Sequence, residues 1–378
     1  MAPDPPASGR GVAMPLGPWL LVVGMHRSGT SAVAGALSRL GFAAPAPDDR
    51  VVDPESNPEH WESQSLGAFD NALLARLGGV WDGPPDLSDG WELAHLPGAD
   101  AAADAEAAEA AAAAFPAGGP LVWKDPRTCL VLPYWRHRIP GPMAAVFVWR
   151  APAAVARSLQ ARDGMDLVDG IALWERYNRT GLAGLAGIDT YVVDYESILE
   201  DPTAGIGAIA AWLGSLDQFA PGAAGWDLEA ATTAVAPSLR HQPVDAADDL
   251  LDDAQRGLVD HLVALGGPHR PVEAPPPGTE SPWTTALLGH RRALWTLAAE
   301  RDHLLRMTAA QTAASESLAA DYLEQIQGLH AELGALRGRL QTTLEANEHL
   351  LASTSWRVTQ PLRSLSQARH RKTDAPER

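Results

Sequence analysis

The sequence predicts an α/β domain with a doubly wound parallel sheet, followed by a C-terminal α-helical coiled-coil extension. Short apolar runs alternate with helical patterns over residues 18–270, a glycine-containing loop follows the first run, and a heptad pattern appears near the C-terminus. Runs that are apolar throughout are typical of parallel strands covered by helices on both faces. The loop resembles a phosphate-binding loop and indicates a fold of the P-loop type.

Four runs have the length and composition of buried strands. They are WLLVV at 19–23, PLVWK at 120–124, AAVFVW at 144–149 and TYVVD at 190–194. The helical patterns between them predict right-handed crossovers. The alanine-rich segment 99–114 is expected to be a further helix, because Ala and Glu are strong helix formers.

Composition divides the rest of the chain. Residues 1–17 are rich in Pro, Gly and Ala and are expected to form a flexible tail. Proline density marks residues 271–290 as a linker. A coiled-coil helix is expected over 291–352 and a C-terminal tail over 353–378.

Core positions of the C-terminal helix recur at alternating spacings of three and four. They are Tyr322, Ile326, Leu329, Leu333, Leu336, Leu340 and, after a gap, Asn347 and Leu350. This is a heptad seam with an Asn at one core position, and Pro361 ends the pattern. We expect homo-oligomerisation through this seam; a long amphipathic helix that folds back on the domain is the alternative.

Charge and composition exclude several classes of partner. The formal net charge of −18 disfavours nucleic acid or an anionic membrane. No run reaches the roughly 18 apolar residues of a transmembrane segment, and the N-terminus lacks the features of a signal peptide. We therefore expect a cytoplasmic protein. The single cysteine, Cys129, lies in an apolar stretch and is expected to be a buried thiol.

The loop GMHRSGTS at 24–31 matches the phosphate-binding consensus G-x-x-x-x-G-K-[ST] except that Thr30 replaces the lysine. Between a strand and a helix, backbone N–H groups of such a loop form an anion site. A turn without a ligand is the alternative. The missing lysine, and the lack of a clear magnesium-binding Asp after a strand, argue against a magnesium nucleotide and a small-molecule kinase.

A second group of anion-binding residues follows the third run. Arg150 ends this run, and Ser158 lies in the next helix, which Pro152 is suited to begin. An Arg at the carboxyl end of a parallel strand faces the crevice in which α/β sheets bind ligands. With the first loop, this pair suits a nucleotide that carries a separate phosphate on its ribose. A surface Arg and an unrelated Ser are the alternative.

Four segments, which follow one another along the chain in the family's order, resemble sulfotransferases that use 3′-phosphoadenosine 5′-phosphosulfate (PAPS). GMHRSGTSAVAGAL resembles the 5′-phosphosulfate-binding loop and RAPAAVARS the 3′-phosphate-binding segment of that family. VWKDPR is similar to the strand-end lysine segment of tyrosylprotein and bacterial sulfotransferases, and VVDYESILEDP to the stretch after the last core strand, which accounts for Asp194. The resemblance implies PAPS as co-substrate and no metal.

The resemblance also assigns residues to the two ends of the co-substrate. Those expected at the phosphosulfate are Arg27, Ser28, Gly29, Thr30 and Ser31. Arg150 and Ser158 are expected at the 3′-phosphate. The segment PSLRHQP, with Arg240 and His241, is a candidate for the late loop that often completes the 3′-phosphate site.

Lys124 is the expected catalytic cation. It and Lys372 are the only lysines among 29 Lys plus Arg. A lone Lys at a strand end suggests a position where Arg cannot substitute; a surface lysine without a role is the alternative. Lys124 would donate to the bridging oxygen as negative charge develops on the leaving phosphate.

The general base is expected soon after the first helix, where related enzymes often carry a catalytic Glu. The stretch WES resembles such a site, so Glu62 is the expected base, with His60 and Glu55 as rivals. Asp125 and Arg127, beside the lysine, are expected to form a structural ion pair; a contact with substrate is the alternative.

The expected acceptor is a cell-surface glycan or glycolipid precursor, in polysaccharide biosynthesis. Tryptophans can stack on sugar rings, although they are more often packing residues. Those in the α/β region are Trp61, Trp81, Trp91, Trp123, Trp135, Trp149 and Trp174. The stretch STSWRVTQPLR at 353–363 resembles tails of bacterial proteins that build such polysaccharides. A catalytically inactive, nucleotide-binding coiled-coil scaffold is the alternative, which Lys124 beside an intact loop disfavours.

Overall fold

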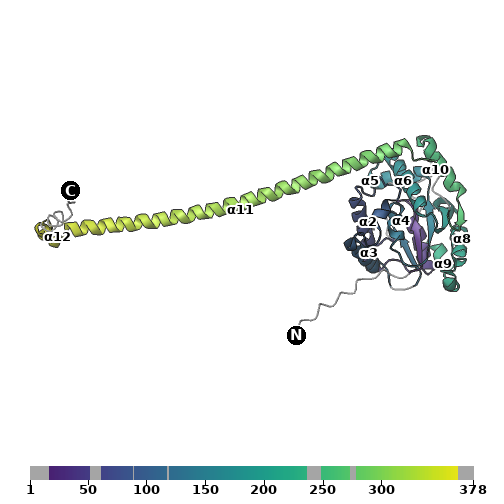
Figure 1. The fold of residues 1–378 in the computed structure, drawn as a ribbon, viewed down its shortest axis with the longest axis horizontal. Helices are drawn as coiled ribbons and strands as arrows, with labels where there is room; N and C mark the ends of the chain where they lie inside the picture. Colours follow the sequence, from purple (N-terminus) through teal and green to yellow (C-terminus); the bar gives the residue numbers. More distant parts are fainter. Residues whose placement is uncertain are drawn as a thin grey trace, which may run out of the picture. The chain divides into compact units, whose positions relative to one another are not determined.

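The computed structural model describes residues 17–51, 61–87, 89–116, 119–235, 248–272 and 278–364. The chain divides into two compact units, of which the first extends to Leu297 and the second begins at Ala298. The first unit is a sheet covered by helices (Figure 1). No helix in the described ranges combines the length and the apolarity needed to cross a bilayer.

The sheet has five strands in the order β2-β1-β3-β4-β5. They are β1 (Trp19–Val23), β2 (Leu121–Lys124), β3 (Met143–Trp149), β4 (Asp189–Asp194) and β5 (Gly267–His269). The four predicted strands are confirmed within one residue and are parallel to one another. The fifth was not predicted, and it runs antiparallel to β4. Its sequence GPH contains Gly and Pro, which are poor strand formers, so composition does not reveal it.

Helices cover both faces of the sheet, which confirms the doubly wound arrangement. Trp19, Leu21 and Val23 of β1 point into one core and Leu20 and Val22 into the other, as the two-residue period of a strand requires. The first core also holds side chains of α2 (Gln64–Arg76), α3 (Ala101–Ala114), α4 (Thr128–Arg136), α5 (Pro152–Asp163), α6 (Leu167–Gly184) and α10 (Asp253–Ala264). The second holds those of α1 (Thr30–Leu40), α7 (Tyr195–Glu200), α8 (Pro202–Gly214) and α9 (Leu228–Thr233).

Short 3₁₀ helices lie between these elements. They are η1 (Pro47–Asp49), η2 (Trp91–His95), η3 (Ala220–Gly225) and η5 (Asp248–Leu250). The expected helix at 99–114 is confirmed by α3, which begins where the Asp100 carboxylate accepts hydrogen bonds from the N–H groups of Ala102 and Ala103. Four N–H groups at a helix start lack partners within the helix, and such caps satisfy some of them.

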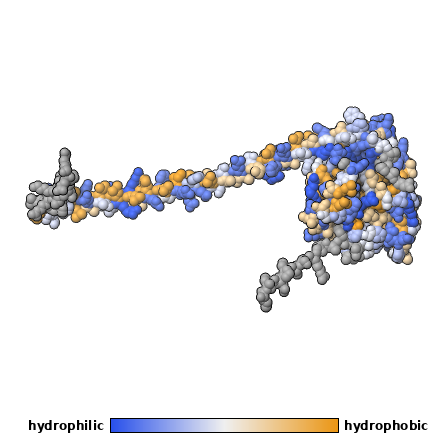
Figure 2. Space-filling view, in the orientation of Figure 1, coloured by the Kyte–Doolittle hydropathy of each residue, from blue (hydrophilic) through white to orange (hydrophobic). Residues whose placement is uncertain are grey.

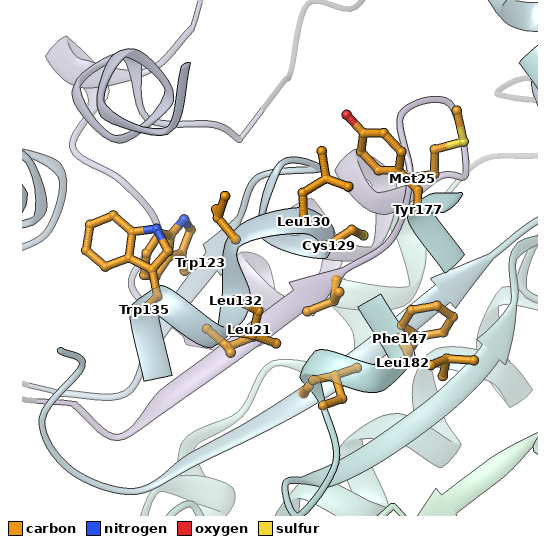
Figure 3. Close-up of a cluster of buried hydrophobic side chains, with 14 of the residues drawn as sticks. Leu21, Met25, Trp123, Cys129, Leu130, Leu132, Trp135, Phe147, Tyr177 and Leu182 are labelled. Atoms are coloured by element: carbon orange, nitrogen blue, oxygen red, sulfur yellow. The ribbon is translucent and has the colours of Figure 1, made fainter. Parts of the chain in front are cut away.

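Aromatic side chains fill the core on the α4 face, where Figure 3 shows Trp123 and Trp135 side by side. Their ring centroids lie 4.8 Å apart in an edge-to-face arrangement. The indole of Trp135 donates a 2.8 Å hydrogen bond to the buried carboxylate of Asp70. Cys129 lies in the same core, as expected, and burial raises the pKa of its thiol.

Strand order brings three loops together at one edge of the sheet. The chain leaves β1 to form β2 on one side and then returns to form β3 on the other. The point between β1 and β3 is therefore a topological switch point, where α/β sheets bind ligands outside the carboxyl ends of the strands. The first loop follows β1, Lys124 ends β2, and Arg150 follows β3.

Helix α11 (Pro282–Ala352) begins inside the segment that the sequence indicates as a linker over 271–290. Its start is held by Glu175 of α6, a carboxylate that is fully buried. Glu175 accepts hydrogen bonds from the Ser281 N–H (3.0 Å) and the Thr284 hydroxyl (2.6 Å). The compact α/β unit therefore extends beyond the expected boundary at residue 270.

In the second unit, helix α11 continues to Ala352 and a short helix, α12 (Thr354–Val358), follows. The hydroxyl of Ser353 caps α12 by accepting from the Trp356 N–H. Residues 299–352 of α11 are exposed. Apolar and polar residues alternate along this helix in Figure 2.

A first prediction follows from Glu175. A chain ended at residue 297 should keep the melting temperature of the α/β unit, whereas one ended at 272 should melt roughly 6–24 °C lower. The shorter chain loses two charge-assisted hydrogen bonds, each worth about 1.5–3 kcal/mol, and about 2–4 °C accompanies each kcal/mol in a domain of this size. Circular dichroism melts measure the difference.

Two matched variants compare the stability that the buried hydrogen bonds of Thr284 contribute with that of an exposed hydrogen bond in the same turn of α11. Thr284→Val removes one bond to Glu175 and one from Gln255, whereas Thr285→Val removes only an exposed bond to Glu280. We expect a lower melting temperature for the first variant alone. Equal melting temperatures for the two truncated chains would show that the unit ends before α11.

Candidate active site

Glycines allow the loop between β1 and α1 to pass close to two neighbours. Gly29 has a φ of 87°, in the left-handed region that favours glycine, and a Cβ there would lie 2.2 Å from the ring of Tyr195. A Cβ on Gly24 would lie 2.2 Å from the carbonyl oxygen of Val148. Arg27 also has a positive φ, of 68°. The loop therefore has one tight path, fixed by β3 and α7.

The loop presents polar groups that the fold itself does not satisfy. Ser28 is fully buried, and within the described part of the chain its hydroxyl has no hydrogen-bond partner. The same holds for the buried Nε2 of His26. Thr30, which is also buried, begins α1, whose first N–H groups face this end of the sheet. Buried polar groups without protein partners are expected where a ligand completes their bonds.

A hydrogen bond joins the two predicted anion-binding segments. The Nε of Arg27 donates to the hydroxyl of Ser158 over 2.8 Å, although 131 positions separate them in the sequence. Ser158 lies on α5, which follows β3, and it is buried. The first loop and the segment after β3 therefore form one continuous site.

Arg150 is fixed at the end of β3 by a carboxylate from α7. Its Nε donates to Oε1 of Glu196 over 2.7 Å, and its guanidinium lies 5.6 Å from the ring of Tyr195. Both members of the ion pair are buried. Among the residues that the structure describes, the Nη2 of Arg150 has no hydrogen-bond partner. One edge of the guanidinium thus remains for an anion.

Lys124 supplies, from β2, the ammonium group that the loop lacks. Its Nζ donates to the hydroxyl of Ser31 over 3.0 Å and forms an ion pair with Oε1 of Glu62. Lys124 is 3% exposed and Glu62 is 8% exposed, so water screens this pair little. The Nη1 of Arg127 lies 3.9 Å from Oε2 of Glu62. Loop, lysine and carboxylate therefore meet at one point.

Arg127 and Asp125 form the ion pair that was expected beside the lysine, with 3.0 Å between Nη1 and Oδ1. The Asp125 carboxylate raises the pKa of Arg127, and burial raises the pKa of Asp125 itself. Burial, together with the charge of Asp125, also raises the pKa of Asp70. Arg127 therefore lies close to two carboxylates, those of Asp125 and Glu62, and its positive charge stabilises their negative charges.

His26, in the loop, packs against a partly exposed tryptophan. Burial lowers the pKa of His26 well below its usual range, and the charge of Arg127 lowers it further. Its imidazole is therefore neutral at neutral pH. The ring centroid of Trp81 lies 4.8 Å from that of His26, and the guanidinium of Arg162 lies 5.5 Å from the Trp81 ring. Trp81 is partly exposed and forms one wall beside the loop.

The segment that carries Trp81 is held by the first turns of α11. The Trp81 carbonyl accepts a 2.6 Å hydrogen bond from the hydroxyl of Tyr177. Arg291 forms ion pairs with Asp82 (2.6 Å) and Asp169 (2.8 Å) and also donates to the Asp82 carbonyl. The start of α11 therefore determines where this wall of the site lies.

The structure brings most of the sequence-predicted site residues together. Those it places along the loop, directly before the cap of α2, at the strand ends and on α5 are Arg27, Ser28, Gly29, Thr30, Ser31, Glu62, Lys124, Arg150 and Ser158. His60, Glu55, Arg240 and His241 lie outside the described residues. Within the described ranges, no three His, Cys, Asp or Glu side chains are grouped so that they could hold a metal ion.

Three neighbours of the site were not assigned a role from the sequence alone: His26, Tyr195 and Glu196. Tyr195 and Glu196 directly follow β4, so their place at a strand end was the available signal. Of the seven tryptophans considered for sugar stacking, Trp123, Trp135, Trp149 and Trp174 are buried in the core, whereas Trp61, Trp81 and Trp91 are partly exposed.

Neither protein-family models nor curated protein sequences give a significant match to this chain. Two of the solved structures that resemble it are sulfotransferase domains. The sulfotransferase domain from the Synechococcus PCC 7002 olefin synthase has 18% sequence identity and a TM-score of 0.33, over 73% of this chain and 94% of that one. The sulfotransferase domain from the curacin biosynthetic pathway has 14% identity and a TM-score of 0.34, over 74% and 98%. Such low values establish neither family nor activity for this chain.

A second prediction concerns His26 and pH. The folded-state pKa of His26 lies below its usual value of 6.5. Between these two pKa values the unfolded chain binds a proton that the folded chain does not, so stability rises with pH. The contribution of His26 is fully present above pH 6.5 and is lost as the pH falls. His26→Gln should therefore lose less stability than the wild type from about pH 7.5 to about pH 5.5.

Urea unfolding at the two pH values measures this change. The raised pKa values of Asp70 and Asp125 act in the opposite direction, so the comparison is between variant and wild type and not between the two pH values alone. If both proteins lost the same free energy of unfolding between the two pH values, His26 would not be buried as a neutral imidazole.

Proposed function

We propose that this chain transfers a sulfuryl group from PAPS to a hydroxyl or amine acceptor, and that the acceptor is a cytoplasmic precursor of a cell-surface glycan or glycolipid. The meeting of Lys124 with both Ser31 of the loop and Glu62 carries this proposal. It places a compact cation, an anion-binding loop and a proton acceptor within hydrogen-bond reach of one another, as transfer of an anionic group to a hydroxyl requires.

The residues fit a donor with two separate anionic groups. The loop and the pair Arg150 and Ser158 would each bind one anionic group, and the Arg27–Ser158 hydrogen bond of 2.8 Å supports two neighbouring positions within one site. Within the described ranges, the buried Ser28 hydroxyl and the buried Nη2 of Arg150 have no hydrogen-bond partner, so they are suited to oxygens of these two groups. When bound, PAPS would supply an activated sulfuryl group.

Each residue then has a role that its position supports. Arg27, Ser28 and the N–H groups at the start of α1 would bind the 5′ end, and Arg150 and Ser158 the 3′-phosphate. Lys124 Nζ would hold positive charge beside the departing oxygen. Because β2 supplies a lysine, Lys124, the loop does not need the consensus lysine at the position of Thr30.

Glu62 is the carboxylate best placed to receive a proton from the acceptor. Its Oε1 contacts Lys124, and its Oε2 is the oxygen nearer to Arg127. His26 is neutral, and its lowered pKa makes it a weaker base than an ordinary imidazole, so we assign it the role of orienting the acceptor. Trp81, partly exposed beside His26, offers a face on which a sugar ring could stack.

The inactive scaffold remains the second candidate, because the long exposed part of α11 suits assembly with other chains. The two candidates differ in one measurable property. Both allow binding of the product nucleotide 3′-phosphoadenosine 5′-phosphate (PAP), whereas only the enzyme transfers sulfate.

A third prediction tests the donor site. PAP should bind without magnesium and raise the melting temperature, because it binds only the folded chain. Arg150→Ala should weaken PAP by roughly 10²-fold, the scale of a lost charge-assisted hydrogen bond, but should barely change binding of adenosine 5′-phosphosulfate, which lacks the 3′-phosphate. Calorimetry in EDTA measures both.

The partner of Arg150 determines the control. Replacing Arg150 alone breaks its buried ion pair with Glu196, so the double variant Arg150→Met/Glu196→Gln tests whether any loss comes from local unfolding. If this double variant lost equal affinity for the two ligands, Arg150 would not be a ligand of the 3′-phosphate.

A fourth prediction tests the chemistry. Lys124→Met should keep PAP affinity within a few-fold but lower turnover by roughly 10²–10³-fold, as for one lost preorganised donor. Lys124→Arg should restore little, because a planar guanidinium does not reproduce a compact ammonium. Glu62→Gln should lower turnover by roughly 10²–10⁴-fold.

The assay is transfer of radiolabelled sulfate from PAPS to glycan precursors in a lysate of the source cells. Wild-type protein that binds PAP but transfers nothing to any fraction would favour the scaffold. If the Glu62→Gln variant were as active as the wild type, the general base would be His60 or Glu55 instead of Glu62.

A further inference from the structure

Helix α11 carries an apolar stripe, interrupted by Thr343 and Asn347, that the other described residues of the chain leave exposed. The apolar members of the seam are Tyr322, Ile326, Leu329, Leu333, Leu336, Leu340 and Leu350, and each is between 47% and 63% exposed. Apolar surface gathered on one helix face is stabilised when another helix covers it. The residues between the seam positions are mostly polar, so the stripe is narrow, as in a coiled coil.

The helix also needs a partner for its own stability. Gly328, Gly334 and Gly338 lie within it, off the seam, and glycine is among the poorest helix formers. A solvated helix gains most of its stability from packing of its apolar face. Packing along the seam would compensate for these three glycines.

We propose that residues 322–350 of two copies of this chain form a parallel, two-stranded coiled coil in register. With Ile326 at heptad position a, Leu329 takes position d, and the flanking positions e and g follow. Glu332 is then at g and Arg337 at e, five residues further on. In a parallel pair, g of one helix faces e of the next heptad on the other, so Glu332 of each copy faces Arg337 of its partner and the charges are complementary.

Asn347 selects the parallel alignment and the register. It takes position a, and Thr343 takes the preceding d. In a parallel pair each polar core residue meets its own copy, so the two asparagine amides can bond to each other. In an antiparallel pair Asn347 would face an apolar or aromatic residue, and its amide would be buried without a partner. A single core Asn is known to fix register and to favour two strands, at some loss of stability.

Cysteine cross-linking of the full chain tests orientation. Tyr322→Cys and Leu350→Cys place a thiol at two d positions, about 42 Å apart along a helix. The native Cys129 is fully buried and does not compete. In a parallel pair each variant should form a disulfide-linked dimer with itself on mild oxidation. Gln341→Cys, at position b, is the matched control and should stay unlinked.

The outcomes separate the possible arrangements. An antiparallel pair or a shifted register would leave both d-position variants unlinked and would overturn the proposal. So would light scattering that shows a trimer, a tetramer or, at tens of micromolar, a monomer of the wild-type chain.

A second pair of variants tests the seam itself. Leu333→Glu/Leu336→Glu should convert the dimer to a monomer while the α/β unit keeps its melting temperature, whereas Ala335→Glu, at position c, should remain dimeric. If the doubly substituted chain remained a dimer, the dimer interface would lie outside the seam and the proposal would be wrong. Asn347→Leu should permit additional oligomeric states or alignments, which cross-linking and light scattering would detect. These results do not depend on the proposed sulfuryl transfer.

Discussion

The adjacency of β2, β1 and β3 is the constraint on which the candidate site depends. Because β1 lies between the other two strands, the carboxyl ends of all three are neighbours. Each end contributes one part of the site: Lys124 from β2, the glycine-containing loop from β1 and Arg150 from β3. The contact of Lys124 with Ser31 and that of Arg27 with Ser158 are direct results of this order.

Paired charges explain how an acidic chain can hold an anion site. The formal net charge is −18, yet cations cluster at the switch point, and several have a carboxylate partner, as with Lys124 and Glu62, and Arg150 and Glu196. An ion pair that is buried loses solvation, and its geometry must compensate for that loss. Such pairs hold the cations in place, and an anionic ligand would share them with the carboxylates.

Helix α11 belongs to two parts of the protein. Its first turns complete the α/β unit, since they satisfy the buried Glu175 and hold the segment of Trp81 through Arg291. The later part has an exposed seam. The wall beside His26 therefore depends on residues far along the chain, and substitutions at the start of α11 are expected to affect the site without touching it.

The sequence by itself determined the parts that depend on local pattern. Continuous apolar runs fixed the four parallel strands, and glycine spacing fixed the loop. The strand-end positions of Lys124 and Arg150 pointed to the site, because parallel strands place their carboxyl ends at one edge. Only the tertiary structure decided the pairing of Arg150 with Glu196, the packing of Tyr195 on Gly29, the place of Trp81 beside His26, and the docking of α11 on Glu175. These contacts join residues that are far apart in the sequence, and no local periodicity encodes which of many compatible side chains will meet once the chain has folded.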